Sequence, residues 1–297
     1  MKKTLFAALV GRPNVGKSTL MNRILGTKVS IVSNKPQTTR TRITGILTKD
    51  DIQYVFLDTP GIHKPKTKLG ATMVKTANSA LGDVDVVLWL VEAGDRIGEV
   101  EASLMRRFKA DDIPVILIIN KTDASSADEI GKTIIRFSAE FSFEAVIPIS
   151  AKTGDNVGDI FGEIDRFAGE SEWIFPDDMF TDQPERVIAS EIIREKLLQT
   201  LDKEVPHGTA VVIEEFSETD TMIKIRAEIF CEKASHKPII IGKGGRELKL
   251  VGTRAREDME RFFGIKVYLD LWVKVKENWR ESESMISNLG FKADEFE

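Results

Sequence analysis

The sequence predicts two domains: an α/β domain with a mostly parallel, doubly wound sheet, followed by a smaller α+β domain. Three observations lead to this prediction. The chain has 297 residues, which is longer than most single domains built around one hydrophobic core. Its first 170 residues alternate short apolar runs with amphipathic stretches. The order of elements then changes beyond a stretch at 172–184 that contains two prolines and shows no periodicity.

The expected strands of the first domain are near-continuous apolar runs, which are typical of strands buried on both faces of a parallel sheet. They lie at residues 4–10, 53–58, 84–91, 114–120 and 144–150. Residues 41–49 are expected to add a strand antiparallel to 53–58, with the turn at residues 49–51. Amphipathic stretches such as "STLMNRILG" and "GEVEASLMRRFKA" predict the helices that cover the sheet.

The second domain begins with a predicted amphipathic helix at residues 185–202. Two strands, "TAVVIEEF" and "MIKIRAEIFC", follow, then a short helix, a glycine loop, a helix to about Phe263 and the strand "KVYLDLWVKV". This α-β-β-α-α-β order predicts a compact α+β unit. The predicted division is a first domain at 1–171, a linker at 172–184, a second domain at 185–280 and an acidic tail at 281–297.

Composition narrows the classes of protein. The net charge of −5 argues against a chain that coats nucleic acid along its whole length, but Lys224–Arg280 holds 14 Lys or Arg against 8 Asp or Glu. That basic region indicates a polyanionic partner. The single cysteine, Cys231, excludes a disulfide framework and is expected to lie buried in a strand. No apolar run approaches the roughly 20 residues of a membrane span, so we expect a cytoplasmic protein.

The first functional motif is "GRPNVGKS", between a predicted strand and a predicted helix. It matches the phosphate-binding loop G-x-x-x-x-G-K-[ST], whose backbone N–H groups surround phosphate oxygens. Lys17 is expected to reach the β- and γ-phosphates, and Ser18 to ligate Mg²⁺. The expected nucleotide contacts of this loop are Gly11, Asn14, Val15, Gly16, Lys17, Ser18 and Thr19.

A second motif, "DTPG", follows the strand at 53–58. Asp58 can hold Mg²⁺ through water, and the Gly61 N–H can meet a γ-phosphate. The segment "KPQTTRTR" at 35–42 should supply a threonine that completes the Mg²⁺ shell, either Thr38 or Thr39, and we favour Thr39. Loss of that contact after hydrolysis would release the segment.

The residue after this motif suggests slow catalysis. Signalling G proteins place a water-orienting glutamine there, whereas this chain has Ile62. The expected catalytic groups are therefore Lys17, Thr39 and Gly61, without a side-chain general base. We expect slow intrinsic hydrolysis, with a partner or a bound ion supplying what Ile62 cannot.

Two further motifs indicate which nucleobase the site binds. In "NKTD", the Asp123 carboxylate can accept hydrogen bonds from the N1–H and amine of guanine, a donor pair that adenine lacks. Asn120 and Lys121 would brace that loop. In "SAK", which comprises Ser150, Ala151 and Lys152, a backbone N–H would meet the guanine oxygen. The order of all four motifs predicts GTP as the ligand and GDP as the product.

The glycine loop of the second domain, "IIIGKGGRE", lacks the hydroxyl residue that a Mg²⁺-nucleotide site needs. A G-x-x-G loop between two helices of an α-β-β-α-α-β unit is the signature of a type II KH domain, which clamps the backbone of single-stranded RNA. Ile239, Ile241 and Leu248 are expected to line the apolar groove. The other expected RNA contacts are Gly242, Lys243, Gly244, Gly245, Arg246 and Lys249.

The combination of "GRPNVGKS", "QTTR", "DTPG", "NKTD" and "SAK" with a C-terminal "IIIGKGG" resembles the Era family of bacterial ribosome-assembly GTPases. The resemblance covers nearly the full chain. It implies binding near the 3′ end of small-subunit ribosomal RNA, a role in assembly of the 30S subunit, and RNA affinity controlled by GTP. It also implies a K⁺ site at Asn14, and peripheral association with the membrane, for which the sequence shows no motif.

Two other functions are compatible with parts of the sequence. The second domain could dock on a protein or membrane surface, or the chain could modify RNA with GTP as a cofactor. The latter would need a reactive group in the second half, where Cys231 has no identifiable partner. Trp173, Trp272 and Trp279 are expected to anchor domain packing rather than to stack on bases.

Overall fold

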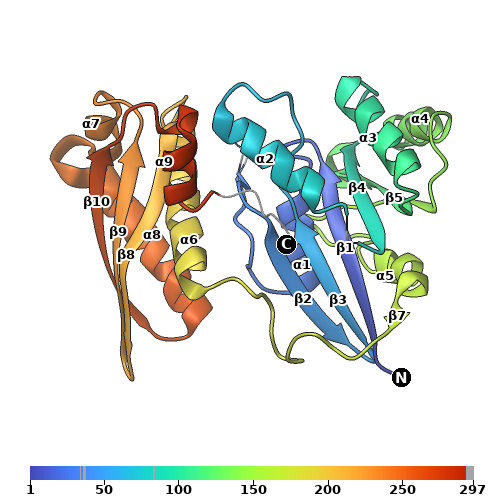
Figure 1. The fold of residues 1–297 in the computed structure, drawn as a ribbon, viewed down its shortest axis with the longest axis horizontal. Coiled ribbons are helices and arrows are strands. Elements are labelled where there is room, and N and C mark those ends of the chain that lie inside the picture. Colours follow the sequence, from blue (N-terminus) through green and yellow to red (C-terminus); the bar gives the residue numbers. More distant parts are fainter. Residues whose placement is uncertain (34, 36–37, 83, 292–297) are drawn as a thin grey trace.

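The computed structural model describes residues 1–33, 35, 38–82 and 84–291. Two domains lie side by side, and the segment that joins them runs along the lower side of the view in Figure 1. Pro36 and Gln37 of the expected switch segment, and residues 292–297 of the expected tail, lie outside the described residues. Within the described part of the chain, no helix has the length and apolar character needed to cross a bilayer.

A seven-stranded sheet forms the centre of the first domain, with the order β2-β3-β1-β4-β5-β6 and with β7 paired to β1. The strands are β1 (Lys3–Gly11), β2 (Ile43–Lys49), β3 (Ile52–Asp58), β4 (Val86–Glu92), β5 (Val115–Asn120), β6 (Ala145–Pro148) and β7 (Gly169–Glu170). β2 and β7 are antiparallel to their neighbours, and the other pairs are parallel. The predicted runs and the β2–β3 hairpin are confirmed, whereas β7 is too short to leave a sequence pattern.

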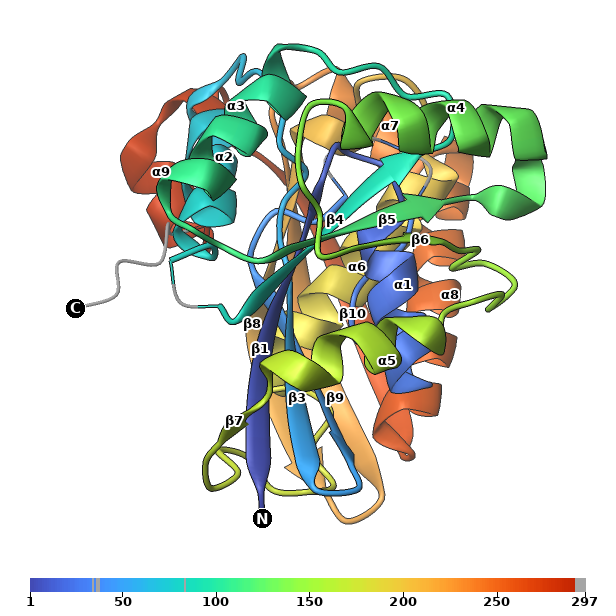
Figure 2. The ribbon, with the colours of Figure 1, turned by 90° about the vertical axis from the view of Figure 1, so that its right-hand side faces the viewer.

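Helices cover both faces of this sheet. They are α1 (Lys17–Leu25), α2 (Lys68–Ser79), α3 (Glu99–Ala110), α4 (Ala127–Ser138) and α5 (Asp159–Ile164), with 3₁₀ turns η1 (Thr122–Ala124) and η2 (Asp165–Phe167). In β1, Leu5 and Leu9 share a core with α1 and α5, whereas Ala8 and Val10 share one with α2, α3 and α4. Figure 2 shows α2 and α3 on one side of the sheet and α1 and α5 on the other. The parallel strands therefore direct their carboxyl ends, and the loops that carry the motifs, to one edge.

The joining segment at 172–184 contains no helix or strand, as its composition predicted. It is nevertheless held against the first domain. The Ile46 N–H donates to the Phe180 carbonyl at 2.9 Å, and the Thr181 hydroxyl donates to the Thr44 carbonyl at 2.6 Å. Residues 182–184 alone separate this attached stretch from the next helix.

The second domain is a three-stranded sheet with helices on one face. Its elements are α6 (Glu185–Thr200), η3 (Pro206–Gly208), β8 (Thr209–Thr219), β9 (Met222–Cys231), α7 (His236–Ile241), η4 (Lys243–Gly245), α8 (Arg246–Phe263) and β10 (Lys266–Val275). The strand order is β10-β9-β8. Ile223, Ile225 and Ile229 of β9 share a core with α6 and α8, and Cys231 is buried as expected. The predicted order of elements is confirmed.

The stretch predicted as an acidic tail instead begins with packed structure. After η5 (Trp279–Glu281), helix α9 (Glu283–Asn288) contributes the buried side chain of Ile286. Ile286, Leu289 and Phe291 share an apolar cluster with Trp279 and with Leu69 of α2. Acidic residues dominated the composition of this stretch, and its few apolar residues gave no periodic signal.

Candidate functional site

A cavity of about 610 Å³ lies at the carboxyl edge of the first sheet. All four sequence motifs and the switch segment contribute to it. Its lining includes Asn14, Gly16, Lys17, Ser18, Thr19, Thr38, Thr39, Gly61, Asn120, Lys121, Asp123, Ala151 and Lys152. Gly11, Val15, Asp58 and Ser150 lie behind this lining, where Asp58 and Ser150 bond to residues that form it. The structure thus gathers the residues expected to bind a nucleotide.

Lys17 lies at the floor of the cavity. Its ammonium group donates to the backbone carbonyls of Gly11 and Arg12 at 3.2 Å and 3.0 Å. Burial lowers the pKa of Lys17 to about 8, although the nearby Asp58 carboxylate acts in the opposite direction. A buried cation held mainly by neutral carbonyls is suited to bind an anion that enters the cavity.

Beside Lys17, three hydroxyl groups converge on one carboxylate. Asp58 Oδ2 accepts from Ser18 Oγ at 2.6 Å and from Ser30 Oγ at 2.8 Å, and Thr39 Oγ1 lies 3.4 Å away. Burial raises the pKa of Asp58, against the opposing effects of Lys17 and the hydroxyls. Asp58 Oδ1 is buried and has no hydrogen-bond partner among the described residues. Such a set of hard oxygen atoms, with one unsatisfied, fits Mg²⁺.

The two candidate threonines of the switch segment, Thr38 and Thr39, point to different partners. Thr39 Oγ1 lies 3.0 Å from Ser18 Oγ. Thr38 Oγ1 instead donates to the Lys35 carbonyl of its own loop at 2.7 Å. Only Thr39 of this pair therefore has its hydroxyl group beside the expected metal position.

The "DTPG" segment passes very close to the phosphate loop. A Cβ atom at Gly61 would lie 2.6 Å from the backbone nitrogen of Pro13, so a larger residue would push the two segments apart. The Ile62 N–H donates to the Gly11 carbonyl at 3.1 Å. The Ile62 side chain is buried in the apolar core with residues of α2 and α3. It therefore cannot position a water molecule in the cavity.

The other end of the cavity is braced by Asn120. Its Nδ2 donates to the Val15 carbonyl at 2.8 Å, and its Oδ1 accepts from the Ala151 N–H at 2.9 Å. One side chain thus connects the phosphate loop with the "SAK" loop. Ser150 Oγ donates to Asp123 Oδ1 at 2.7 Å, which fixes the orientation of that carboxylate. Lys121, the lysine of the "NKTD" motif, forms an ion pair with Glu92.

The glycine loop of the second domain forms the turn between α7 and α8. Gly244 has φ +62°, and a Cβ atom placed there would meet nothing within 4 Å. The loop backbone is therefore accessible to a ligand. A hollow of about 380 Å³ between α8 and β10 begins at this loop, and it is lined by Gly245, Leu248, Lys249, Gly252, Thr253, Arg256, Leu269 and Leu271.

The remaining residues expected to contact RNA lie around the loop. Lys243 and Arg246 are exposed on it. Ile239 and Ile241 lie on α7 and are not part of the hollow, although they were expected in the groove. Ile239 is half exposed, whereas Ile241 packs against the core of the domain. The far wall of the hollow is formed instead by β10.

The switch segment also contacts the second domain. The Arg40 guanidinium is buried and donates to the carbonyls of Thr209 and His207, at 2.6 Å and 2.8 Å. In the opposite direction, Arg194 of α6 donates to the carbonyl of Thr38. The residues on either side of Thr39 are therefore attached to the second domain.

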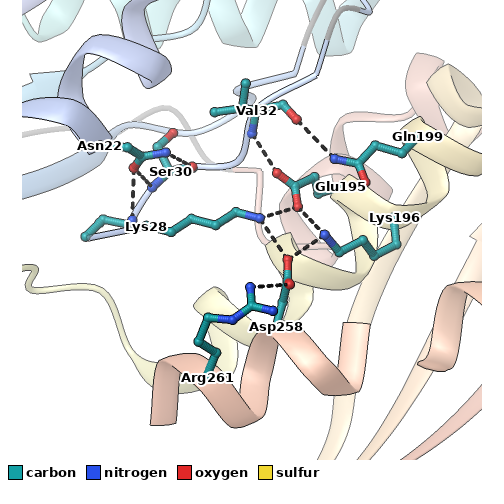
Figure 3. Close-up of polar contacts among 10 residues, drawn as sticks. Asn22, Lys28, Ser30, Val32, Glu195, Lys196, Gln199, Asp258 and Arg261 are labelled. Atoms are coloured by element: carbon teal, nitrogen blue, oxygen red, sulfur yellow. Dashed lines mark hydrogen bonds and ion pairs between the residues drawn. The ribbon is translucent and has the colours of Figure 1, made fainter. Parts of the chain in front are cut away.

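A cluster of ion pairs adjoins these contacts (Figure 3). Lys28 of the first domain pairs with Glu195 of α6 at 2.5 Å and with Asp258 of α8 at 2.9 Å. Lys196 pairs with the same two carboxylates, and Glu195 also accepts from the Val32 N–H at 2.9 Å. Burial raises the pKa of Asp258, but the bonds from Lys196 and from Lys28 together outweigh this effect and lower the pKa to about 2.

Sequence reasoning missed several of these residues. Ser30 lies outside any motif, and its approach to Asp58 depends on the path of the loop after α1. Arg12 occupies a variable position of the phosphate-loop motif, yet it forms two hydrogen bonds to Glu101 of α3, at 2.5 Å and 2.6 Å. The contacts between domains join residues more than 150 positions apart, so no local pattern could indicate them.

The first domain thus has the site of a P-loop GTPase, and the second has the elements and glycine loop of a KH domain. Residues 6–121 match the family described as 50S ribosome-binding GTPase, and residues 204–280 match the KH domain family. Proteins named GTPase Era from Alkaliphilus metalliredigens and Alkaliphilus oremlandii are 49% and 50% identical to the chain. These alignments cover 98% and 97% of the chain and 99% of each relative. The chain belongs to the Era family of GTPases.

Two solved structures are similar over the whole chain. One is a variant of Aquifex aeolicus Era bound to GDP·AlF₄⁻, with a TM-score of 0.91, 40% identity, and coverage of 98% of this chain and 99% of that one. The other is Era in complex with MgGDPNP and nucleotides 1506–1542 of 16S ribosomal RNA, with a TM-score of 0.92, 40% identity, and coverage of 98% and 100%. The predicted family, the fold of both domains and the GTPase activity are confirmed.

Proposed function

We propose that this GTPase binds small-subunit ribosomal RNA near its 3′ end during assembly of the 30S subunit, and that the bound nucleotide controls RNA binding. The nucleotide site belongs to residues 1–171 and the RNA site to residues 185–280, joined by residues 172–184. The relative crystallised with nucleotides 1506–1542 of 16S ribosomal RNA supports the choice of RNA. The accessible glycine loop beside the hollow on α8 supports the placement of the site.

Mg²⁺ fits the first site. Ser18 and Thr39 would hold it directly and Asp58 through water, as the convergence of their oxygen atoms suggests. When bound, the ion would neutralise negative charge on the β- and γ-phosphate oxygens of GTP. Lys17 contributes a second positive charge, and the Gly61 N–H is positioned by the close passage of its segment over Pro13. Asp123 would select guanine, with a backbone N–H of the "SAK" loop meeting the guanine oxygen.

Slow intrinsic hydrolysis is expected from the position of Ile62. Because Ile62 is apolar and buried, the side chain that follows Gly61 cannot orient a water molecule. Asn14 lines the cavity and is the residue that would bind K⁺ there. Replacing K⁺ by Na⁺ in a turnover assay is then expected to slow the wild-type protein. An Asn14→Ala variant should respond much less to the exchange.

One observation carries the proposed control by nucleotide: the switch segment is attached to both sites. Thr39 lies at the expected Mg²⁺ position, while Arg40 and the Thr38 carbonyl bind the second domain. If γ-phosphate and Mg²⁺ hold Thr39, they also hold the segment on which the second domain rests. Hydrolysis would release Thr39, weaken these contacts and allow the RNA to leave.

The test is recovery of cellular RNA by the protein loaded with a non-hydrolysable GTP analogue or with GDP, followed by sequencing. Enrichment of the 3′ end of small-subunit ribosomal RNA with the analogue alone is expected. Equal recovery in both states would leave the RNA site standing and refute the control by nucleotide. Absence of RNA in both states would refute the RNA site and favour a protein or membrane partner.

Gly244 offers a matched pair of variants for the RNA site. Its positive φ is tolerated by both Asp and Asn, so Gly244→Asp and Gly244→Asn should fold alike. Only the aspartate brings a negative charge to the place where RNA phosphates would lie. We expect Gly244→Asp to abolish RNA recovery, Gly244→Asn to retain most of it, and GTP binding to persist in both.

A further inference from the structure

The two faces of strand β10 carry different kinds of side chain. Leu269 and Leu271 face the hollow beside the glycine loop. The alternate residues Tyr268 and Trp272 lie on the other face, and their exposed fractions are 59% and 58%. The expectation that Trp272 anchors domain packing is therefore wrong, although it holds for Trp279, which is fully buried.

This second face of the sheet is not covered by the helices of the domain. The helices pack against Ile223, Ile225 and Ile229 of β9, which point to the opposite face. Figure 1 shows α8 crossing behind the three strands. The last helix, α9, shares an apolar cluster with Phe230 and Val212, at one end of the open face. Tyr268 and Trp272 lie outside that cluster.

Basic side chains surround the two aromatic rings. Tyr268 is in register with Lys224 of β9, and Lys266 and Lys274 lie on the same face of β10, two residues from Tyr268 and Trp272 respectively. The carboxylates of this face are already engaged by partners within it. Arg226 pairs with Glu215, Lys274 pairs with Glu228, and Trp272 Nε1 donates to Asp270.

The bond from Trp272 also has a geometric consequence. Because the indole N–H is bound to Asp270 at 2.8 Å, the ring is held beside the strand without being buried. Four residues of strand place Tyr268 and Trp272 about 13 Å apart. Each ring can therefore receive a separate base. Exposed aromatic side chains on a sheet, flanked by cations, are a recurrent platform for stacking unpaired bases.

We propose that the open face of β10, with Tyr268 and Trp272, is a second RNA contact that stacks unpaired bases beyond the groove at the glycine loop. The contact is continuous with that groove, since β10 is an edge strand whose two faces serve the two sites. An RNA strand leaving the hollow would cross this edge to reach the rings. The inference rests on the proposed RNA binding by the groove, which holds only about four nucleotides.

The test measures binding of nucleotides 1506–1542 of 16S ribosomal RNA, and of shorter fragments truncated from either end, to the full chain with a GTP analogue. We expect a Tyr268→Ala/Trp272→Ala variant to bind the long RNA at least fivefold more weakly. It should bind the shortest RNA that the wild type retains with unchanged affinity. Tyr268→Phe and Trp272→Phe should recover most of the loss, because stacking needs the ring alone.

Trp173→Ala, a tryptophan change in the joining segment where the indole donates to the Asp51 carbonyl, serves as the control and should bind both RNAs normally. Trp272→Phe should also remove part of the fluorescence quenching that RNA causes in the wild type. Equal binding of the long RNA by the double alanine variant and the wild type would overturn the proposal. So would an equal loss with both RNA lengths, which would indicate damage to the groove.

The outcomes also separate this proposal from the one on which it rests. If the wild type binds none of these RNAs, the proposed RNA binding fails, and the second contact fails with it. If Gly244→Asp abolishes binding of both lengths while the double alanine variant behaves as wild type, the groove stands and the second contact alone is refuted.

Discussion

Replacement of Arg40 tests whether the switch segment holds the second domain. The guanidinium group is 3% exposed, donates to two backbone carbonyls and lies over two rings. Its central carbon is 5.7 Å from the ring centroid of Trp279 and 5.6 Å from that of Phe291. Arg40→Ala removes these interactions and leaves the buried Thr209 carbonyl and the partly buried His207 carbonyl without this donor.

The net contribution of Arg40 to the free energy of docking between the two domains is the difference between favourable and unfavourable terms. Two hydrogen bonds from a charged donor contribute about 3–6 kcal/mol, and the ring contacts add about 1–2 kcal/mol. Burial of a cation costs several kcal/mol. That cost is apparent here, because burial and, to a lesser degree, Arg194 lower the pKa of Arg40 to about 9. A net contribution of about 2–3 kcal/mol remains, which corresponds to a factor of about 30–150 in the docking equilibrium.

The assay compares RNA affinity in the presence of a GTP analogue and of GDP. For Arg40→Ala, the ratio of the two affinities should fall towards one, and amide exchange at residues 207–209 should become faster. Arg40→Lys should resemble Arg40→Ala, since lysine lacks the planar fork that reaches both carbonyls. Arg106→Ala, an exposed change on α3, is the control. An unchanged ratio together with unchanged exchange would refute the role of Arg40.

Three further predictions concern single residues. Thr39→Val should weaken Mg²⁺-dependent binding of the GTP analogue about tenfold or more and leave GDP binding nearly unchanged, whereas Thr38→Val should have little effect in the same titration. Asp123→Asn should weaken GTP binding by about two orders of magnitude, because the guanine donors lose their acceptor, and a calorimetric titration that gives wild-type affinity would contradict the assigned role. Asp258, whose pKa is about 2 in the folded chain, should contribute about 2 kcal/mol of stability that is present above pH 4 and lost as the pH falls through 2. Denaturant unfolding across that range should show a smaller acid-induced loss in Asp258→Asn and in Lys28→Ala than in the wild type.

The fold could be predicted largely because both domains follow simple periodic rules. Buried parallel strands such as β4 and β5 are continuous apolar runs, and the α-β-β-α-α-β order of the second domain is legible in its alternating segments. Helix α9 could not be predicted in the same way. Its apolar residues fit a cluster made jointly by η5 and α2, and neither surface is visible from the local sequence.

The residues of the candidate site also differ in whether the local sequence could predict them. Motif residues such as Lys17 and Asp123 were predictable, since a short loop and a fixed chemistry define them. Ser30 and Arg40 were not, because their partners are set by the path of a loop and by the contact between domains. Trp272 was misjudged for a related reason, since alternation in β10 places an apolar residue outside as readily as inside.

The attachment of the joining segment to β2 limits how far the two domains can separate. With Phe180 and Thr181 bonded to β2, the free tether is residues 182–184 rather than the whole stretch between the domains. A tether this short keeps the effective local concentration of the second domain high even when its contacts are broken. When its contacts break, the second domain would rotate about residues 182–184 and stay close to the first domain. Its rebinding would therefore not require diffusion from solution. Modest changes in contact energy can therefore set the fraction of time that the domains spend together.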